Sequence, residues 1–177
     1  FEASDERLIR YLAEHNHWSP FAHTFLSFRI KAPVFVARQL VKHQVGLVWN
    51  EESRRYITHD PEIYNIRKWR EKPDSSKQGS GEQILISTEL NLEVSEHLQQ
   101  GLSLYNRLLL ENVAPEQARA VLPQSMYTNW IWSGTLYAFA RVCELRLDEH
   151  SQKETQEIAR QLDIHCCLLY TSPSPRD

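Results

Sequence analysis

The segment from residue 38 to residue 56, RQLVKHQVGLVWNEESRRY, interleaves charged and large apolar side chains. Its four cations, one histidine and one carboxylate pair alternate with residues such as Leu40, Val45 and Trp49. A charge run that is only solvated does not carry so much apolar surface. The segment must therefore face the protein interior on one side and an anion on the other. We interpret it as the wall of a site for a phosphate-bearing ligand with a flat ring.

Composition limits the class of protein. The 177 residues are enough for one domain with a core of its own, and the hydrophobic fraction of 41% is normal for a globular protein. A net charge of -3 argues against a general nucleic-acid binder. The sequence has no apolar run near the ~20 residues of a membrane span, and its three cysteines form no disulfide framework. We expect a cytoplasmic protein without nucleic-acid or membrane partners.

The two ends of the sequence differ from the rest. Phe1 stands where a start methionine is expected, so we expect an incomplete N-terminus. The final stretch, CLLYTSPSPRD at 167–177, has no helical period and matches the translation of a sequencing adapter. We expect a domain over 1–166 followed by a non-native tail over 167–177. The alternative for the tail is a natural disordered terminus.

Apolar periodicity and Pro/Gly positions predict a mixture of helices and strands. Strands are expected over 24–30 and 126–132, and loops over 50–55 and 69–82. Helices are expected over 5–14, 34–43, 82–112, 115–123, 135–147 and 151–162. The apolar face of the longest helix is wider than one domain needs to bury, which favours an oligomer.

Two arginines, Arg119 and Arg146, lie among apolar residues in ARAVLP and CELRLDEH. A buried guanidinium without a partner is costly, so both need partners. The arginine fork matches a phosphate or a planar imide edge. In the alternative interpretation, the arginines form structural ion pairs with Glu51, Glu52, Glu144 and Asp148.

The histidines and the serine of this region permit several roles. His15, His17 and His23 do not have a standard zinc spacing and no cysteine lies near them, so we expect no metal. His43 either stabilises the negative charge of a ring, hydrogen-bonds a cofactor, or is a helix C-terminal histidine favoured by the dipole. Ser53 has no adjacent base, so its hydroxyl bonds a ligand or caps a turn. The absence of a Gly-rich phosphate motif excludes Rossmann and P-loop sites.

Several separated motifs, in the right order, resemble the flavin-dependent thymidylate synthases. The family frame RQWxRHRxxSxNExSxRY corresponds to RQLVKHQ at 38–44 and NEESRRY at 50–56. HxxPFxH matches 17–23, KAPxFVARQ matches 31–39, ARxxLPxxxYT matches 118–128 and LRxDxHxQxExQ matches 145–156. The resemblance extends over residues 5–162 and identifies a phage- or bacterial-like variant with KHQ in place of RHR.

The sequence departs from the family pattern at two places. Lys42 and Gln44 replace arginines, and eight residues rather than seven separate the triplet from Ser53. We expect the extra residue to bulge within 46–49. Where the family has Asn-x-Arg and a later Asn or His, this chain has Thr135, Tyr137 and Arg141. Flavin contacts at these positions would use different bonds.

The resemblance implies the thymidylate synthase-complementing fold, an α+β single domain with a central mixed or antiparallel sheet flanked by long helices. It implies reductive methylation of dUMP to dTMP with 5,10-methylenetetrahydrofolate and NADPH through FAD. It also implies a homotetramer whose sites are shared between subunits.

The resemblance also implies the site residues. Arg146 would be catalytic, facing the uracil edge. The dUMP set would be Gln39, Lys42, Glu51, Glu52, Ser53, Arg54, Arg55, Arg119 and Arg146. The FAD set would be His17, Ser19, Lys42, His43, Gln44, Glu51, Tyr137 and Arg141.

Two other classes stay open. The altered triplet and Arg141 are compatible with an FAD- or nucleotide-binding homologue that is catalytically impaired. The aromatic residues Tyr127, Trp130, Trp132 and Tyr137 could stack bases in a single-stranded nucleic-acid module. An aromatic strand is more often core, and the negative net charge argues against the second class.

Overall fold

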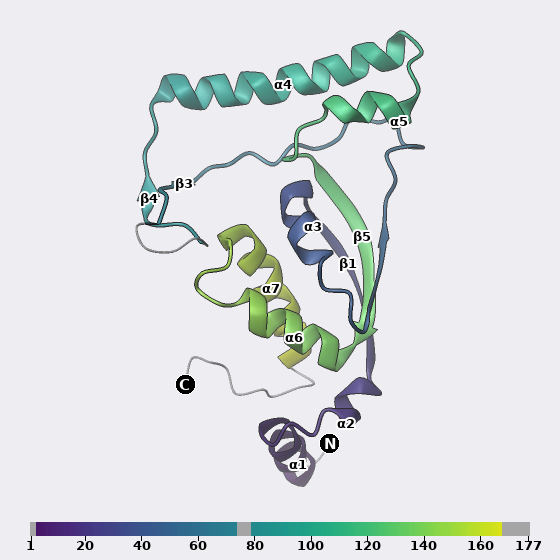
Figure 1. Cartoon of the computed structure of the whole chain (residues 1–177), viewed down its shortest axis with the longest axis vertical. Helices are drawn as coiled ribbons and strands as arrows, with labels where there is room; N and C mark the ends of the chain where they lie inside the picture. Colours follow the sequence, from purple (N-terminus) through teal and green to yellow (C-terminus); the bar gives the residue numbers. More distant parts are fainter. Residues whose placement is uncertain (1–2, 74–78, 168–177) are drawn as a thin grey trace. The chain divides into compact units, whose positions relative to one another are not determined.

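The structure is a computed structural model that describes residues 3–73 and 79–167 (Figure 1). The predicted tail therefore lies outside the described residues, except for the backbone of Cys167, where the last helix ends. The chain forms two compact units. The first comprises residues 1–29, 40–49 and 131–177, and the second comprises residues 30–39 and 50–130.

The predicted helices and strands all occur in the predicted order, and four short elements that were not predicted occur in addition, at residues 19–22, 47–51, 69–70 and 83–84. The helices are α1 (Ala3–Glu14), α2 (Ser19–Ala22), α3 (Val34–Leu40), α4 (Thr88–Leu110), α5 (Pro115–Ala118), the 3-10 helix η1 (Arg119–Val121), α6 (Leu136–Arg146) and α7 (Lys153–Cys167). The strands are β1 (Phe25–Pro33), β2 (Leu47–Glu51), β3 (Trp69–Arg70), β4 (Gln83–Ile84) and β5 (Tyr127–Thr135).

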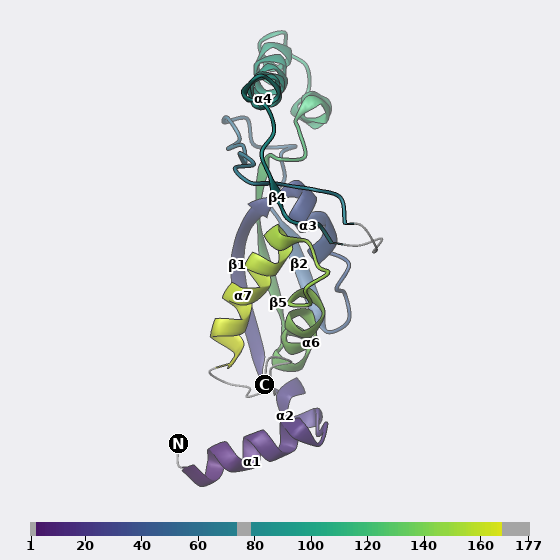
Figure 2. The same ribbon diagram turned by 90° about the vertical axis from the view of Figure 1, so that its left-hand side faces the viewer.

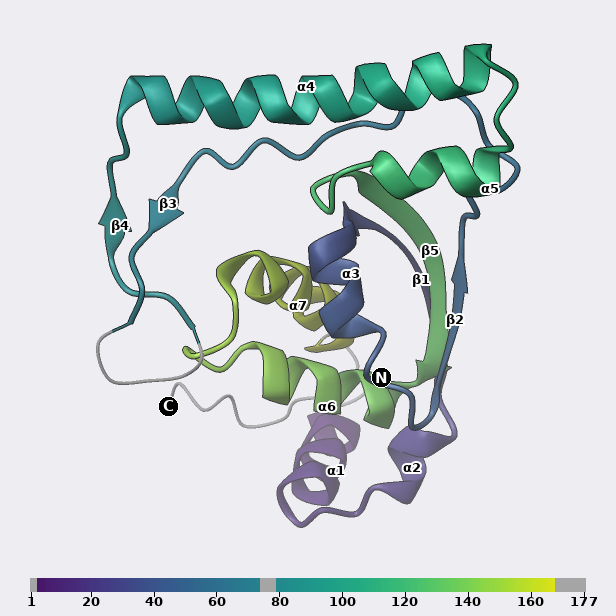
Figure 3. The same ribbon diagram turned by 45° about the horizontal axis from the view of Figure 1, so that its top comes forward.

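The main sheet has three strands in the order β1-β5-β2 and is antiparallel (Figure 3). In β5 the residues Thr128, Trp130, Trp132 and Gly134 are buried and alternate with less buried neighbours. This period of two is what a strand needs to send one set of side chains into a core. The α+β class and the antiparallel sheet predicted from the sequence are confirmed.

Two predicted boundaries were wrong for local reasons. Residues 83–84 pair with 69–70 in a second, two-stranded antiparallel sheet, with Trp69 opposite Ile84 and Arg70 opposite Gln83. The long helix therefore begins at Thr88 rather than at residue 82, and Ser87 caps it by accepting the Leu90 N–H at 3.1 Å. The helix predicted over 34–43 ends at Leu40.

Strand β2 was missed, because residues 50–55 were expected to form a loop. The strand is short and largely exposed, so it lacks a clear apolar alternation. The predicted bulge at 46–49 is also absent. The Glu52 N–H bonds Asn129 O at 2.9 Å and the Thr135 N–H bonds Gly46 O at 3.3 Å. These pairs are six residues apart on both strands, from 46 to 52 and from 129 to 135, so neither strand holds an extra residue between them.

The backbones of Gly46 and Gly134 approach each other closely where β2 begins. A Cβ on Gly134 would overlap Gly46 O and lie 2.7 Å from Leu47 Cδ2. Gly46 itself adopts a left-handed φ of 75°, and a Cβ there would lie 3.1 Å from Ala138 Cβ. Only glycine at 134 allows this approach.

Gly134→Ala should therefore destabilise the fold by about 1–3 kcal/mol, the usual cost of overpacking. The midpoint of urea unfolding measures the effect. Gly101→Ala on α4 is the matched control. Its Cβ would meet Val121 O at 3.3 Å, and the gain in helix propensity offsets this tight contact. Equal midpoints for Gly134→Ala and the wild type would contradict the close approach.

The core of the first unit lies where α6 and α7 pack side by side against strand residues (Figures 1 and 2). Phe139 on α6 contacts Phe28 and Trp132 edge-on, with ring centroids 4.9 Å and 5.4 Å apart. Leu136 and Val142 on the same helix are also buried. The helix begins at a proper cap, because Thr135 Oγ1 accepts the Ala138 N–H at 3.1 Å. The site described below rests on this core.

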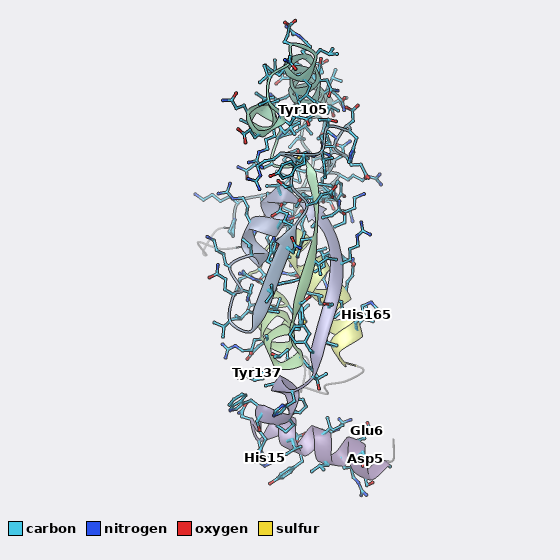
Figure 4. The ribbon with its side chains drawn as sticks, turned by 90° about the vertical axis from the view of Figure 1, so that its right-hand side faces the viewer. Asp5, Glu6, His15, Tyr105, Tyr137 and His165 are labelled. Carbon is cyan, nitrogen blue, oxygen red and sulfur yellow. The ribbon has the colours of Figure 1, made fainter. Side chains whose placement is uncertain are left out.

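In the second unit, α4 contacts the rest of the unit mainly through its C-terminal end. Tyr105, labelled in Figure 4, is fully buried and donates its hydroxyl to Ile57 O at 3.3 Å. Asn106 donates to Asp60 at 2.9 Å. From Thr88 to Leu104 the helix has no buried residue, and Leu90 and Leu92 are exposed. Within the described chain, the broad apolar face predicted for this helix is thus buried at Tyr105 and only partly covered or exposed elsewhere.

Candidate active site

Arg146 and His43 meet in the first unit although 103 residues separate them. Arg146 is the last residue of α6, and His43 follows the end of α3. The Arg146 Nε–H donates to His43 Nε2 at 2.8 Å, and both side chains are half-buried. Because Nε2 accepts this bond, the geometry assigns the imidazole proton to Nδ1. A cation is thereby held against a neutral imidazole.

A tryptophan ring lies beside the histidine of this pair. Trp132 lies edge-on to His43 with centroids 6.4 Å apart, and edge-on to Trp49 at 5.6 Å. The Trp132 side chain is completely buried, and its Nε1–H has no hydrogen-bond partner among the described residues. Water is therefore excluded from this side of the pair, which strengthens electrostatic interactions there.

The surroundings shift both titration equilibria. Burial, followed by the charge of Arg146, lowers the pKa of His43 below its ordinary value of 6.5. Burial also lowers the pKa of Arg146, although a guanidinium remains protonated at neutral pH. The unfolded chain takes up the His43 proton more readily than the folded chain. This histidine therefore destabilises the fold as the pH falls below about 6.5.

Gln156 of α7 holds the connection that follows Arg146. It is the last residue of the motif at 145–156, and no role was predicted for it from the sequence. Its side chain is buried, and its Nε2 donates to Asp148 O at 3.0 Å, Glu149 O at 3.3 Å and Ser151 O at 2.8 Å. A buried amide with its donors satisfied in this way fixes the loop. Gln156 thus holds the backbone immediately after the C-terminal end of α6.

All but one of the residues predicted to bind flavin lie in the first unit, the exception being Glu51. Tyr137, labelled in Figure 4, contacts Trp18 at the start of α2 with ring centroids 6.0 Å apart. Lys42 and Arg141 are exposed and form no ion pair among the described residues. The remaining three, His17, Ser19 and Gln44, are also exposed. Exposed cations and a pair of aromatic rings within one unit are residue types that suit a flavin and its pyrophosphate.

The residues predicted to bind dUMP lie mostly in the second unit, with Lys42 and Arg146 in the first. In this unit Ser53 Oγ accepts the Arg55 Nε–H at 3.2 Å, and the Tyr56 N–H bonds Ser53 O at 3.2 Å. The serine therefore caps a turn, one of the two roles predicted for it. Arg54 donates to His59 O. Gln39 is half-buried and Arg55 is exposed.

Arg119 does not occupy the buried setting that its neighbours in the sequence indicated. It is exposed at the junction of α5 and η1, and its Nε–H donates to Glu116 O at 3.2 Å. Ala118 beside it takes the buried position. An exposed arginine needs no partner inside the protein. The expected burial of Arg119 therefore gives no reason to assign it a ligand.

The alternative of structural ion pairs fails for most of the proposed partners. Glu52 accepts from Asn129 Nδ2 at 2.8 Å, and Asp148 Oδ1 accepts the His150 N–H at 2.8 Å. Among the described residues, Glu52, Glu144 and Asp148 form no ion pair with an arginine. Glu51 accepts the Thr128 hydroxyl at 2.7 Å. The two carboxylates at the end of β2 thus bond polar residues of β5.

A polar pocket in the second unit was not foreseen from the sequence. It is lined by Lys31, Glu52, Arg54, His59, Asp60, Glu62, Tyr127, Thr128 and Asn129. Lys31 pairs with Glu62 at 2.5 Å and lies 5.2 Å from the centre of the Tyr127 ring. Three carboxylates against two permanent cations do not favour a dianionic phosphate.

Within the described residues, no group of three or more His, Cys, Asp or Glu side chains is arranged to hold a metal ion. No helix in residues 3–73 and 79–167 combines the length and apolar character needed to cross a bilayer.

Comparison with known proteins places these residues in a family. The family described as thymidylate synthase complementing protein matches residues 2–167. A flavin-dependent thymidylate synthase of Kosmotoga olearia is 40% identical over 159 residues, which cover 88% of this chain and 68% of that protein. A protein of the same name from Dictyostelium discoideum is 35% identical over 161 residues, covering 89% of this chain and 53% of its own length.

Solved structures agree with the sequence comparison. The crystal structure of the UMP/dUMP methylase PolB from Streptomyces cacaoi, bound with 5-Br dUMP, superposes with a TM-score of 0.79 at 28% identity. The match covers 97% of this chain and 78% of that one. With the match of the family over residues 2–167, these likenesses show that the chain belongs to the thymidylate synthase complementing family, which includes the flavin-dependent thymidylate synthases.

Proposed function

We propose that this chain is a flavin-dependent thymidylate synthase, a methyltransferase that converts dUMP to dTMP. Its co-substrates would be 5,10-methylenetetrahydrofolate and NADPH, and its cofactor FAD. The names of its relatives support the flavin and the reaction, and the solved methylase supports a uridylate substrate. The observation that carries the proposal is the half-buried Arg146 held against neutral His43 beside Trp132.

Arg146 is suited to polarise a uracil ring. A guanidinium fork matches the planar imide edge of uracil with parallel hydrogen bonds. Negative charge that develops on the ring is stabilised by a fixed cation, and more strongly where water is excluded. Trp132 and Trp49 provide that exclusion on one side. Cys143 and Cys166 are both buried, which does not favour them as nucleophiles toward the ring.

For the cofactor we propose the residues of the first unit. Lys42 and Arg141 would hold the flavin pyrophosphate, while His17, Ser19 and Gln44 would donate further hydrogen bonds. Tyr137 would contribute aromatic surface. When bound, FAD would supply the hydride-transfer chemistry that passes reducing equivalents from NADPH to the one-carbon unit added to the nucleotide, which becomes the methyl group.

For the nucleotide we propose the residues at the end of β2 and in the turn after it, together with three residues from elsewhere in the chain. Arg55 and Arg119 are exposed, form no ion pair among the described residues, and would bind the phosphate. Gln39, Lys42, Glu51, Glu52, Ser53 and Arg54 complete the proposed set. Arg54 would have to leave His59 O to reach a ligand, and Glu52 would have to leave Asn129.

We also propose that this chain forms a homotetramer and that it functions in the cytoplasm. The uncovered apolar side chains of α4 would form contacts between subunits, and the exposed flavin and phosphate residues would be completed by other subunits. We also propose that the functional domain comprises residues 1–166 and that 167–177 is a non-native tail.

The test is a visible spectrum followed by NADPH oxidation with and without dUMP. The proposal expects a yellow protein whose flavin reduction responds to dUMP. UMP is assayed in parallel, because the solved relative is named for both nucleotides. A yellow protein that binds dUMP but produces no dTMP would instead support the catalytically impaired homologue. A protein that takes up no FAD would contradict the proposal.

A further inference from the structure

We infer that His43 is a positioning residue that orients the Arg146 guanidinium toward the uracil ring, in addition to any contact that it makes with flavin. This inference rests on the proposed function. It begins from the hydrogen bond of 2.8 Å between Arg146 Nε and His43 Nε2.

That bond fixes a direction as well as a distance. The three nitrogens of a guanidinium lie in one plane with its central carbon. When the Nε–H is bound, rotation about the last side-chain torsions of Arg146 is restricted, and the plane of the group is set. An arginine acts on a planar ring only when its fork is aligned with the ring edge. The hydrogen bond to the Nε–H therefore orients the terminal fork of the guanidinium before the substrate binds.

His43 is itself well held. Its backbone N–H bonds Leu40 O at 3.0 Å, which anchors it to the end of α3, and Leu40 is completely buried. Its ring lies edge-on to Trp132, which is also completely buried. On the other side, Arg146 ends α6, and Leu147 N–H bonds Cys143 O at 2.8 Å to close that helix. Both partners of the bond are thus attached to rigid parts of the first unit.

A neutral imidazole suits this task better than a carboxylate. A carboxylate on Nε would orient the guanidinium but would also offset its charge. The imidazole accepts the bond without a charge of its own, so this contact leaves the electrostatic effect of Arg146 on a substrate intact. The lowered pKa of His43 keeps the ring in the accepting form at neutral pH.

The experiment uses two matched substitutions in the whole chain loaded with FAD. His43→Gln keeps a terminal acceptor, because the glutamine Oε1 can take the place of Nε2. His43→Phe keeps the flat ring beside Trp132 but has no acceptor. Calorimetry measures dUMP binding, and flavin fluorescence measures FAD binding. We expect His43→Phe to weaken dUMP binding by about 10-fold or more and His43→Gln by less than about 3-fold.

A double-mutant cycle tests the coupling directly. In an Arg146→Ala background, His43→Phe should weaken dUMP binding no further, since the group that it positions is gone. If the phenylalanine variant does not fold, His43→Ala gives the same comparison with a smaller side chain.

The outcomes separate the inference from the proposed function. If the wild type binds no dUMP, the proposed function fails and this inference fails with it. If the wild type binds dUMP and His43→Phe binds it equally well, only the inference is overturned. Equal losses for His43→Gln and His43→Phe, or additive effects of His43 and Arg146, would also overturn it.

Discussion

Arg146→Ala should lower kcat/KM for dTMP formation by about 100- to 1,000-fold while the protein still binds FAD. Removing one fixed donor that stabilises developing charge costs a factor of this size in other enzymes. We expect FAD to stay bound because Arg146 itself is not among the residues proposed to bind flavin. Product formation is measured by chromatography, and FAD content by visible absorbance.

Arg146→Lys provides the control for this experiment. Lysine keeps the charge but has neither the planar fork nor an Nε–H aimed at His43 Nε2. It should retain more activity than alanine and less than the wild type. If both variants turned over dUMP at the wild-type rate, Arg146 would have no part in the reaction.

Trp132→Ala should have the largest effect on stability, about 3–5 kcal/mol, the usual cost of removing a buried aromatic side chain. Trp132 is completely buried and contacts His43, Trp49 and Phe139 edge-on. Equilibrium unfolding in guanidinium chloride measures the change. The cavity would also loosen the support of His43.

Trp132→Phe separates packing from hydrogen bonding at the same position. Phenylalanine keeps part of the volume and removes an indole N–H that has no partner among the described residues. An unsatisfied buried donor costs about 1–3 kcal/mol, so its removal offsets part of the lost contact. The phenylalanine variant should lose less than half of the free energy that alanine loses. Equal losses of stability in the two variants would mean that the unpaired N–H does not destabilise the native state.

Most of the helices and strands could be predicted because each leaves a pattern of apolar residues or prolines within its own segment. The alternation of Trp130 and Trp132 marked β5, and proline at residues 33 and 115 marked helix starts. Strand β2 and the β3–β4 ribbon were missed because they are short, partly exposed and stabilised by partners far along the chain. Such pairings leave little signal in the segment itself.

The candidate site was predicted by resemblance more than by residue pattern. Nothing in the spacing of His43 and Arg146 indicates that they touch, because they are 103 positions apart in the sequence. The resemblance assigned the two residues to different ligands. Burial of Arg119 was inferred from apolar neighbours, but in the short helices around it the buried position falls to Ala118. Apolar neighbours in the sequence thus predict the burial of a residue poorly where no long helix or strand determines which side chains point into the core.

Measuring dTMP in a complete reaction with FAD, dUMP, 5,10-methylenetetrahydrofolate and NADPH tests the proposed activity most directly. We expect dTMP formation that stops when either FAD or dUMP is omitted, and that falls in Arg146→Ala while FAD stays bound. A wild-type protein that binds FAD and dUMP but forms no dTMP under these conditions would contradict the proposed synthase activity.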